Sequence, residues 1–310
     1  MSAEPRLLWA AGARLGEGAL WDDRIERLWW VDIHGRRLHR MDAAGGDRAS
    51  WDLPQEPGHV ALTDDPERLI LGLRPGHFLF APRGGRLEPL AVPQGHSPHH
   101  RLNDGKVDDA GRLWFGTMHE AEHASEAALH LLRPERQAAR VAFPFTVPNG
   151  PAFTGDGTTM YLSDSSARVI LAFDIADVVP VRRREFIRFA KDDGYPDGMT
   201  VDAEGGLWVA HWGGSRVSRF AADGSRAGSI PLPVQDVTSC AFGGTDLRTM
   251  FVTTAGGSGR PDEGPAGGVF AIRTAVGGRR AGRVPLGQQA ADHLDACQAH
   301  PSEGSERAPD

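Results

Sequence analysis

The sequence predicts an all-β fold, a six-bladed β-propeller with a central metal site, from three observations. A short hydrophobic triplet recurs six times at intervals of about 40–50 residues, which is the repeat length of a four-stranded blade. Turns rich in glycine and aspartate precede the triplets, and no long amphipathic helical pattern interrupts the repeats. The triplets are Leu28-Trp29-Trp30, Leu69-Ile70-Leu71, Leu113-Trp114-Phe115, Met160-Tyr161-Leu162, Leu207-Trp208-Val209 and Met250-Phe251-Val252.

Each repeat is expected to contain the same succession of strands. A polar or small residue opens the first strand, a hairpin turn follows, and the triplet forms the second strand. A third strand shows the alternation of a strand with two different faces, as at Val169 and Leu171 or at Val217 and Arg219. The expected turns are 22–24, 64–66, 109–111, 155–157, 203–205 and 243–245.

The ends of the chain complete this plan. Residues 6–10 are expected to supply a strand that closes the last blade. The repeats continue without a break to about residue 286, so residues 1–287 are predicted to form one propeller domain. The polar segment 288–310 lacks periodicity and is expected to be a disordered tail. Residues 120–132 fit either a turn or two of helix or a loop followed by a strand from near Ala128.

The composition argues against several classes of function. A formal net charge of −7 does not favour nucleic-acid binding, which needs a basic surface. The arginines at 182–184 are interpreted as part of a solvated strand or loop. No stretch approaches about 18 apolar residues, so no membrane-spanning helix is expected. Only two cysteines, Cys240 and Cys297, and no signal-peptide pattern predict a cytoplasmic protein without a structural disulfide.

A ring of polar residues is predicted around the central channel. The position about ten residues before each triplet opens an innermost strand, and innermost strands of a propeller run along one axis. Two carboxylates and two amides at these positions form an oxygen-rich set suited to calcium, magnesium or manganese, with zinc or ferrous iron also compatible. Burying two carboxylates together is costly unless a cation or a proton compensates them. The ring is Glu17, Gly58, Asn103, Asn149, Asp197 and Ser239.

Five longer motifs follow one another in blade order between residues 14 and 272. They are LGEGALWDDRIERLWWVDI, RLNDGKVDDAGRLWFGTM, VPNGPAFTGDGTTMYLSDS, PDGMTVDAEGGLWVAHWGG and VTSCAFGGTDLRTMFVTTA. This series resembles the signatures of the regucalcin (senescence marker protein)/gluconolactonase family, and most closely its bacterial aldonolactonases. The resemblance implies a six-bladed propeller that binds one divalent cation and hydrolyses a sugar lactone such as xylono-, arabino- or gluconolactone.

The resemblance also implies roles for individual residues. Glu17, Asn149 and Asp197 match the family's metal ligands in the motifs GEG, PNG and PDG. Arg101 and Asn103, in RLNDG, match residues that face the oxygens of the substrate.

One substrate contact of the family does not match by position. The animal members place a substrate-binding glutamate shortly after GTM, and a direct count puts that position on Ala121. Glu120 is assigned as the substrate-binding replacement, and Glu122 and the loss of this contact are the alternatives. The identity of the sugar therefore stays open.

Together with this resemblance, these residues predict a divalent-metal-dependent lactonase. By analogy with the family, Asp197 is expected to act as both ligand and general base, and the forked guanidinium of Arg101 is expected to hold lactone oxygens. The partner is a small sugar lactone, and the oligomeric state stays open. Two alternatives remain, namely a hydrolase of organophosphates or other esters on the same scaffold and a non-catalytic calcium-binding regulatory protein. Arg101 and Asn103 beside the metal ligands favour catalysis, because ion binding alone does not need them.

Other polar and aromatic residues fit structural roles better. His96, His99 and His100 lack a partner motif at zinc-ligand spacing and are expected to be solvated or to line the mouth. Asp104 is expected to hydrogen-bond its own turn. Trp212 fits either stacking on a sugar or packing in the core. The tryptophans expected to pack between blades are Trp29, Trp114 and Trp208.

Overall fold

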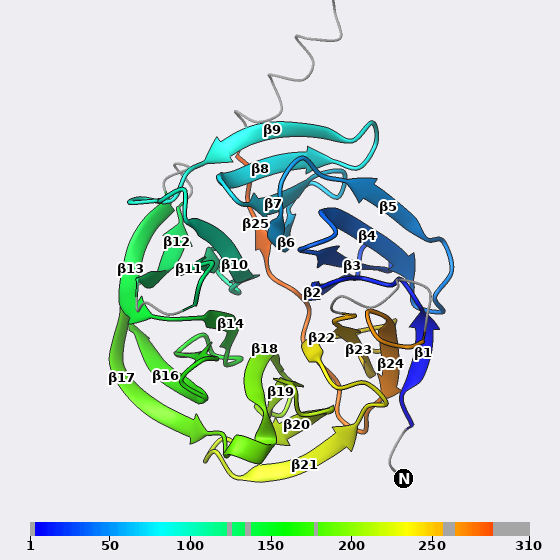
Figure 1. Cartoon of the computed structure of the whole chain (residues 1–310), viewed down its shortest axis with the longest axis vertical. Coiled ribbons are helices and arrows are strands. Elements are labelled where there is room, and N and C mark those ends of the chain that lie inside the picture. The colour runs from blue at the N-terminus through cyan, green and yellow to red at the C-terminus, as the bar shows by residue number, and fades with distance from the viewer. Residues whose placement is uncertain (1–3, 123–125, 134–137, 177–178, 257–263, 288–310) are drawn as a thin grey trace, which may run out of the picture.

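Six β-sheets surround a central axis, as Figure 1 shows for the computed structural model. The structure describes residues 4–122, 126–133, 138–176, 179–256 and 264–287. The predicted all-β, six-bladed propeller is confirmed. The one helical segment among these residues is the short 3-10 helix η1 (Lys191–Asp193). No described helix is long and apolar enough to span a membrane.

In blades 1 to 5, four consecutive strands run from the axis to the rim (Figure 1). Blades 1 and 2 contain β2 (Gly16–Asp22), β3 (Arg27–Asp32), β4 (Arg37–Asp42), β5 (Ala49–Asp52), β6 (Pro57–Thr63), β7 (Leu69–Leu73), β8 (Gly76–Ala81) and β9 (Arg86–Ala91). Blades 3 and 4 contain β10 (His100–Val107), β11 (Leu113–His119), β12 (Ala127–Leu132), β13 (Ala138–Phe145), β14 (Pro148–Phe153), β15 (Thr159–Asp164), β16 (Val169–Ala176) and β17 (Val179–Arg188). Blade 5 contains β18 (Tyr195–Val201), β19 (Leu207–Trp212), β20 (Arg216–Phe220) and β21 (Arg226–Pro231).

Blade 6 joins the two ends of the propeller. Its strands β22 (Val237–Gly243), β23 (Thr249–Thr254) and β24 (Val269–Arg273) are completed by β1 (Arg6–Trp9), which pairs antiparallel with β24. The predicted closing strand is therefore confirmed, and each hydrophobic triplet lies in the second strand of its blade. This closure ties the N-terminal segment to the last blade and so completes the ring of blades.

Two ambiguous segments are resolved as strands. Within residues 120–132 the chain forms β12, which starts at Ala127 and is buried along its length, so the strand alternative is confirmed. The arginines at 182–184 lie on the rim strand β17 and are exposed, as expected. Cys240 is a free, buried thiol. The predicted tail 288–310, which includes Cys297, lies outside the described residues.

The core lies between neighbouring blades, where the repeated tryptophans pack as predicted. Trp29, Trp114 and Trp208 belong to hydrophobic clusters that join adjacent blades. The Trp114 indole donates to Asp108 Oδ2 at 2.9 Å, and the Trp208 indole donates to Asp202 Oδ2 at 2.8 Å. Each aspartate also accepts main-chain N–H groups of its own hairpin turn. One carboxylate thus satisfies both a tight turn and a buried indole, which favours this sequence pattern at the hairpin.

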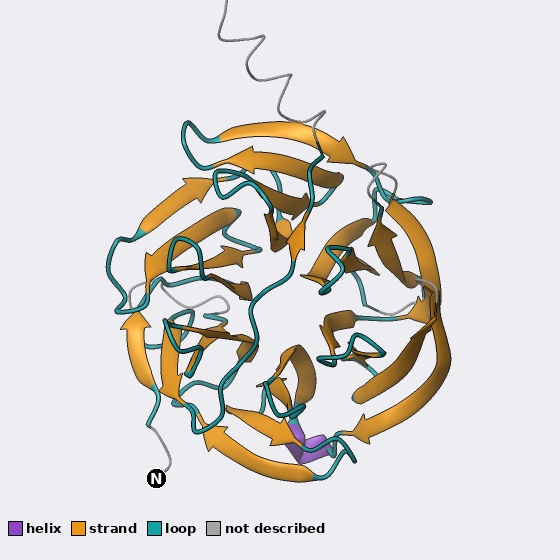
Figure 2. Cartoon of the chain, turned by 180° about the vertical axis from the view of Figure 1, so that it is seen from behind, coloured by secondary structure: helices purple, strands orange, loops and turns teal. Residues whose placement is uncertain are grey.

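A strap after the last blade, residues 275–286, crosses one end of the channel (Figure 2). Its short strand β25 (Arg283–Val284) pairs in parallel with the last residues of β6. Arg283 donates to Asp23 Oδ1 at 2.5 Å in blade 1, and Arg279 pairs with Asp109 in blade 3. The sequence predicted no strand here. Because the strap meets the C-terminal end of β6, it crosses the end of the channel opposite to the predicted ring.

Candidate active site

A β-bulge interrupts every innermost strand at the ring position. A bulge adds an unpaired residue, bends the strand and redirects its side chains. After Glu17 and Asn149, the glycines Gly18 and Gly150 take left-handed φ values of 63° and 83°, which other residues adopt only with strain. The pairing register shifts at Glu17/Leu20, Pro57/His59, Leu102/Gly105, Asn149/Ala152, Pro196/Met199 and Val237/Ser239.

The ring position of blade 2 is a glycine because β10 passes too close for a side chain. A Cβ atom at Gly58 would lie 2.2 Å from the carbonyl oxygen of Leu102. We therefore expect Gly58→Ala to lower the free energy of unfolding by about 1–3 kcal/mol in urea denaturation. Gly228→Ala is the control, since nothing lies within 4 Å of a Cβ there. Equal stability of the two variants would contradict this close approach.

One cavity of about 420 Å³ collects most of the predicted site residues. Glu17, Arg101, Asn103, Asn149 and Asp197 all line it. Trp212 also lines the cavity, so of its two expected positions the structure supports the one at the cavity and not the one in the core. The remaining lining residues are Leu15, Ile33, Glu122, Val147, Ser165, Ser166 and Tyr195.

Buried carboxylates dominate the electrostatics of this cavity. Burial raises the pKa of Glu17 to about 8, and the negative charge of Asp104 adds to the rise. Burial also raises the pKa of Asp197 well above its usual value, with a further contribution from the charge of Glu17. Asp197 Oδ1 is buried and has no hydrogen-bond partner among the described residues. An unpaired carboxylate oxygen next to a second buried carboxylate is an arrangement that a cation would stabilise.

The donor atoms of Glu17, Asn149 and Asp197 fit a hard divalent cation. They offer carboxylate and amide oxygens without nitrogen or sulfur, as calcium and magnesium prefer. No group of three His, Cys, Asp or Glu side chains placed to hold a metal ion occurs among the described residues. Because one of its three members is an asparagine, the candidate set of Glu17, Asn149 and Asp197 is not a group of this kind. The ligand roles of the three residues stay predictions.

Both carboxylate oxygens of Asp104 accept main-chain N–H groups, and one of these bonds lies within its own turn, as the sequence predicted. Its Oδ1 accepts the N–H of Gly105 at 2.8 Å, and its Oδ2 accepts the N–H of Gly150 at 3.0 Å. The second bond joins β10 to the bulge of β14. Asp104 therefore stabilises the ring and adds negative charge near Glu17 and Asp197.

Arg101 and Asn103 form one unit on β10. Arg101 Nη1 donates to Asn103 Oδ1 at 2.6 Å, and both side chains are buried. Burial lowers the pKa of the guanidinium, while the negative charges of Glu56, Glu17 and Glu122 oppose this effect. A guanidinium remains charged at neutral pH even so, because its ordinary pKa is above 12. Arg101 thus brings a positive charge into a cavity lined by carboxylates.

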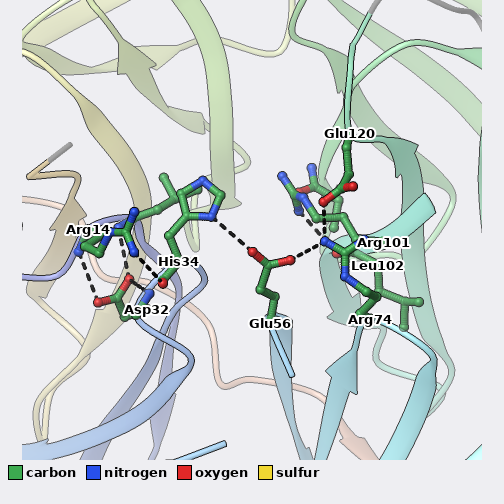
Figure 3. A network of polar contacts seen from close by, with 11 residues as sticks. Arg14, Asp32, His34, Glu56, Arg74, Arg101, Leu102 and Glu120 are labelled. Carbon is green, nitrogen blue, oxygen red and sulfur yellow. Dashed lines mark hydrogen bonds and ion pairs between the residues drawn. The ribbon is translucent and has the colours of Figure 1, made fainter. Parts of the chain in front are cut away.

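Glu120 lies beside this cavity in a network of ion pairs. Figure 3 shows Arg74 between the carboxylates of Glu56 and Glu120, with Glu56 also 3.4 Å from His34 Nδ1. Glu120 does not belong to the cavity lining, whereas Glu122 does. Of the two glutamates that the sequence offered for this contact, Glu122 is therefore the one that lines the cavity, and the substrate contact itself stays a prediction.

The three histidines before RLNDG are outside the cavity lining. His99 is exposed, His96 is half-buried, and His100 is buried with its Nε2 3.7 Å from Glu126 Oε2. They form no metal site among the described residues.

Sequence reasoning missed the cavity roles of Tyr195 and Ser165. Tyr195 precedes Asp197 by two positions on β18, so strand alternation places both on one face. It also pairs in register with Trp212 on β19. Alternation counted backwards from Asp197 could have found this residue. Ser165 follows the end of β15, and no sequence pattern marks it.

Comparisons with known proteins identify the family of this chain. A family profile described as the SMP-30/Gluconolactonase/LRE-like region matches residues 15–256. The chain is 36% identical over 277 residues to the L-arabinolactonase of Azospirillum brasilense, covering 87% of this chain and 91% of that protein. It is 34% identical over 278 residues to a pentonolactonase of Haloferax volcanii, covering 86% and 93%.

Among solved structures, regucalcin of Agrobacterium tumefaciens, described as a calcium-binding protein, superposes with a TM-score of 0.85. The sequences are 27% identical, and the match covers 91% of this chain and 97% of the other. The fold, the order of the motifs and these matches agree, and the chain belongs to the SMP-30/gluconolactonase/LRE-like family.

Proposed function

We propose that this lactonase depends on one divalent cation and hydrolyses a neutral sugar lactone to the aldonic acid. The observation that carries the proposal is the meeting of Glu17, Asn149 and Asp197 at one cavity, where Asp197 Oδ1 is buried and unpaired. Arg101 and Asn103 beside them supply groups that ion binding alone does not need. The relatives named arabinolactonase and pentonolactonase support the substrate class.

Glu17, Asn149 and Asp197 would hold the cation through their side-chain oxygens. When bound, such a cation polarises a carbonyl group and lowers the pKa of water. Calcium is the first ion to test, because the regucalcin of Agrobacterium tumefaciens is described as calcium-binding. Manganese, magnesium, zinc and ferrous iron are the other ions in the proposal.

The residues of this chain divide the hydrolysis between them. Asp197 accepts a proton from water as the new bond to the lactone carbonyl carbon forms. It returns that proton to the ring oxygen as the ester bond breaks, which leaves an aldonic acid. Arg101 donates N–H groups to lactone oxygens, and Asn103 holds the guanidinium in place. Tyr195 and Trp212 offer ring surfaces to the sugar.

The charges of the cavity favour a neutral substrate. Glu17, Asp197 and Glu122 line it with carboxylates, and Arg101 is the one cationic side chain among the lining residues. Because like charges repel strongly in a partly buried site, we expect lactones that carry sulfonate or phosphate groups to react more slowly than neutral ones.

Acid release from a substrate panel tests the proposal. Neutral aldonolactones, a phosphorylated lactone and phosphotriesters are incubated with the protein and a pH indicator, with and without chelator, against spontaneous hydrolysis. We expect turnover of neutral lactones that chelator abolishes and added calcium or manganese restores. Turnover of phosphotriesters alone would support the alternative hydrolase. Cation binding without turnover of any substrate would support the regulatory protein.

The structure predicts different effects at the two neighbouring glutamates. Glu122→Ala removes an acceptor from the cavity, so we expect the KM for a lactone to rise about tenfold, as for a lost hydrogen bond worth ~1.4 kcal/mol. Glu120→Ala is the matched control and should change KM less than about twofold, since Glu120 contacts Arg74 outside the cavity. If initial-rate measurements show a larger rise in KM for Glu120→Ala than for Glu122→Ala, Glu120 is the substrate contact and Glu122 is not.

A further inference from the structure

We infer that Ser165 is a positioning residue whose hydroxyl fixes which end of the Asn149 amide faces the cation. The inference rests on the proposed function in taking Asn149 as a cation ligand. An amide has an oxygen end and a nitrogen end of nearly equal size, and only the oxygen can bind a metal ion. A site that uses asparagine therefore needs neighbours that set the direction of the amide, whereas a carboxylate ligand does not.

The hydroxyl of Ser165 has only one way to bond. It lies 2.6 Å from the carbonyl oxygen of Pro196, which can only accept, so the hydroxyl proton is committed to that bond. The hydroxyl oxygen then faces Asn149 Nδ2 at 3.0 Å as an acceptor. The amide nitrogen is thereby held at Ser165, and Oδ1 is left on the other side. Ser165 is itself buried, so water does not compete freely for these bonds.

The opposite side of the amide agrees with this direction. Arg101 can only donate, and its Nη1 donates to Asn103 Oδ1 at 2.6 Å. Asn103 must then turn its Nδ2 outward, where it donates to Asn149 Oδ1 at 2.7 Å and to the carbonyl oxygen of Pro148 at 2.9 Å.

The relay therefore runs in one direction from Arg101 through Asn103, Asn149 and Ser165 to Pro196. Its first member has only donors, and its last member has only an acceptor. A flipped Asn149 would set two N–H groups against each other at Asn103 and two acceptors against each other at Ser165. Such unmatched buried polar groups cost more than the bonds they replace. The relay thus presents Oδ1 before any cation binds.

A double-mutant cycle tests the inference by calorimetric titration of calcium chloride into chelator-stripped protein. Ser165→Ala should weaken calcium binding about 10–100-fold, as loss of a group that orients a ligand does. In an Asn149→Asp background the same change should weaken binding less than about threefold, because a carboxylate presents oxygen in either orientation. This contrast separates amide direction from a general loss of packing.

A neighbouring serine supplies the control. Ser163 is also buried, but its hydroxyl donates to the main-chain carbonyl of Asn149 at 3.2 Å and not to the amide. Ser163→Ala should change calcium affinity less than about threefold. Ser165→Cys keeps the branching of the side chain, leaves no cavity and replaces a good acceptor by a weak one, so it should weaken binding even if Ser165→Ala folds poorly.

The outcomes distinguish the inference from the proposed function. Equal weakening in the Asn149 and Asn149→Asp backgrounds, or no weakening by either Ser165 variant, would overturn the role of Ser165. If the unaltered protein binds none of calcium, manganese, magnesium, zinc and ferrous iron, the cation site and this role are overturned together. A cycle that follows expectation in a protein without lactone turnover would uphold the role of Ser165 and reject the proposed reaction.

Discussion

Asp197→Asn is expected to lower kcat/KM for lactone hydrolysis by about 10²–10⁴-fold, the usual contribution of a general base. Asparagine keeps the shape of the side chain and can still accept a hydrogen bond, but it cannot take a proton from water. The effect should be large because Asp197 Oδ1 is the buried carboxylate oxygen in this cavity without a partner among the described residues. Initial rates at saturating cation, measured on a neutral aldonolactone, give the comparison.

A second carboxylate controls for the loss of charge. Asp236 is partly buried and lies outside the cavity lining, so Asp236→Asn should retain kcat/KM within about twofold. Urea denaturation should show that the Asp197→Asn protein is folded. An Asp197→Asn enzyme with full activity would mean that another group takes the proton, and the proposed mechanism would then be wrong.

Chelation is expected to make the stability of the protein fall as pH rises from about 4.5 to about 8. Burial raises the pKa of Glu17 from 4.5 to about 8 in the cation-free folded state, and it raises the pKa of Asp197 as well. The folded state then binds more protons than the unfolded state in this window, so the free energy of unfolding decreases with pH. This loss in the free energy of unfolding is absent at a pH below the pKa of the unfolded state and complete at a pH above the pKa of the folded state.

A bound cation should flatten this dependence, because it compensates the two carboxylates in place of protons. Urea denaturation at pH 5, 6, 7 and 8 in chelator and in calcium measures the difference. Glu17→Gln should flatten the curve in chelator and also weaken calcium binding, since it removes one charge from the pair. Parallel curves in chelator and in calcium would show that Glu17 and Asp197 do not meet a cation.

Local patterns made much of the propeller predictable. The triplets are spaced by one blade each, and turn residues and strand alternation are properties of short segments. Even the ring of Glu17, Asn103, Asn149 and Asp197 followed from counting back along equivalent blades. The structure adds the reason, which is a bulge at that position in every innermost strand.

Local patterns could not predict the strap or the positions of the two glutamates at the cavity. β25 has two residues and pairs in parallel with a strand far earlier in the chain, so no local pattern marks it. Glu120 and Glu122 are two positions apart in one loop, but Glu120 pairs with Arg74 and Glu122 lines the cavity. Loop conformation depends on distant partners, which a count from a motif does not include.

The sequence by itself determined the six repeats, the closing strand and the set of residues that face the axis, because each depends on spacing along the chain. Only the tertiary structure decided that Glu122 rather than Glu120 lines the cavity, that the strap crosses the far end of the channel, and that Ser165 contacts Asn149. The physical reason is that these features are contacts between blades. Their partners are far apart in sequence, and donor and acceptor directions become fixed only when both sides are in place.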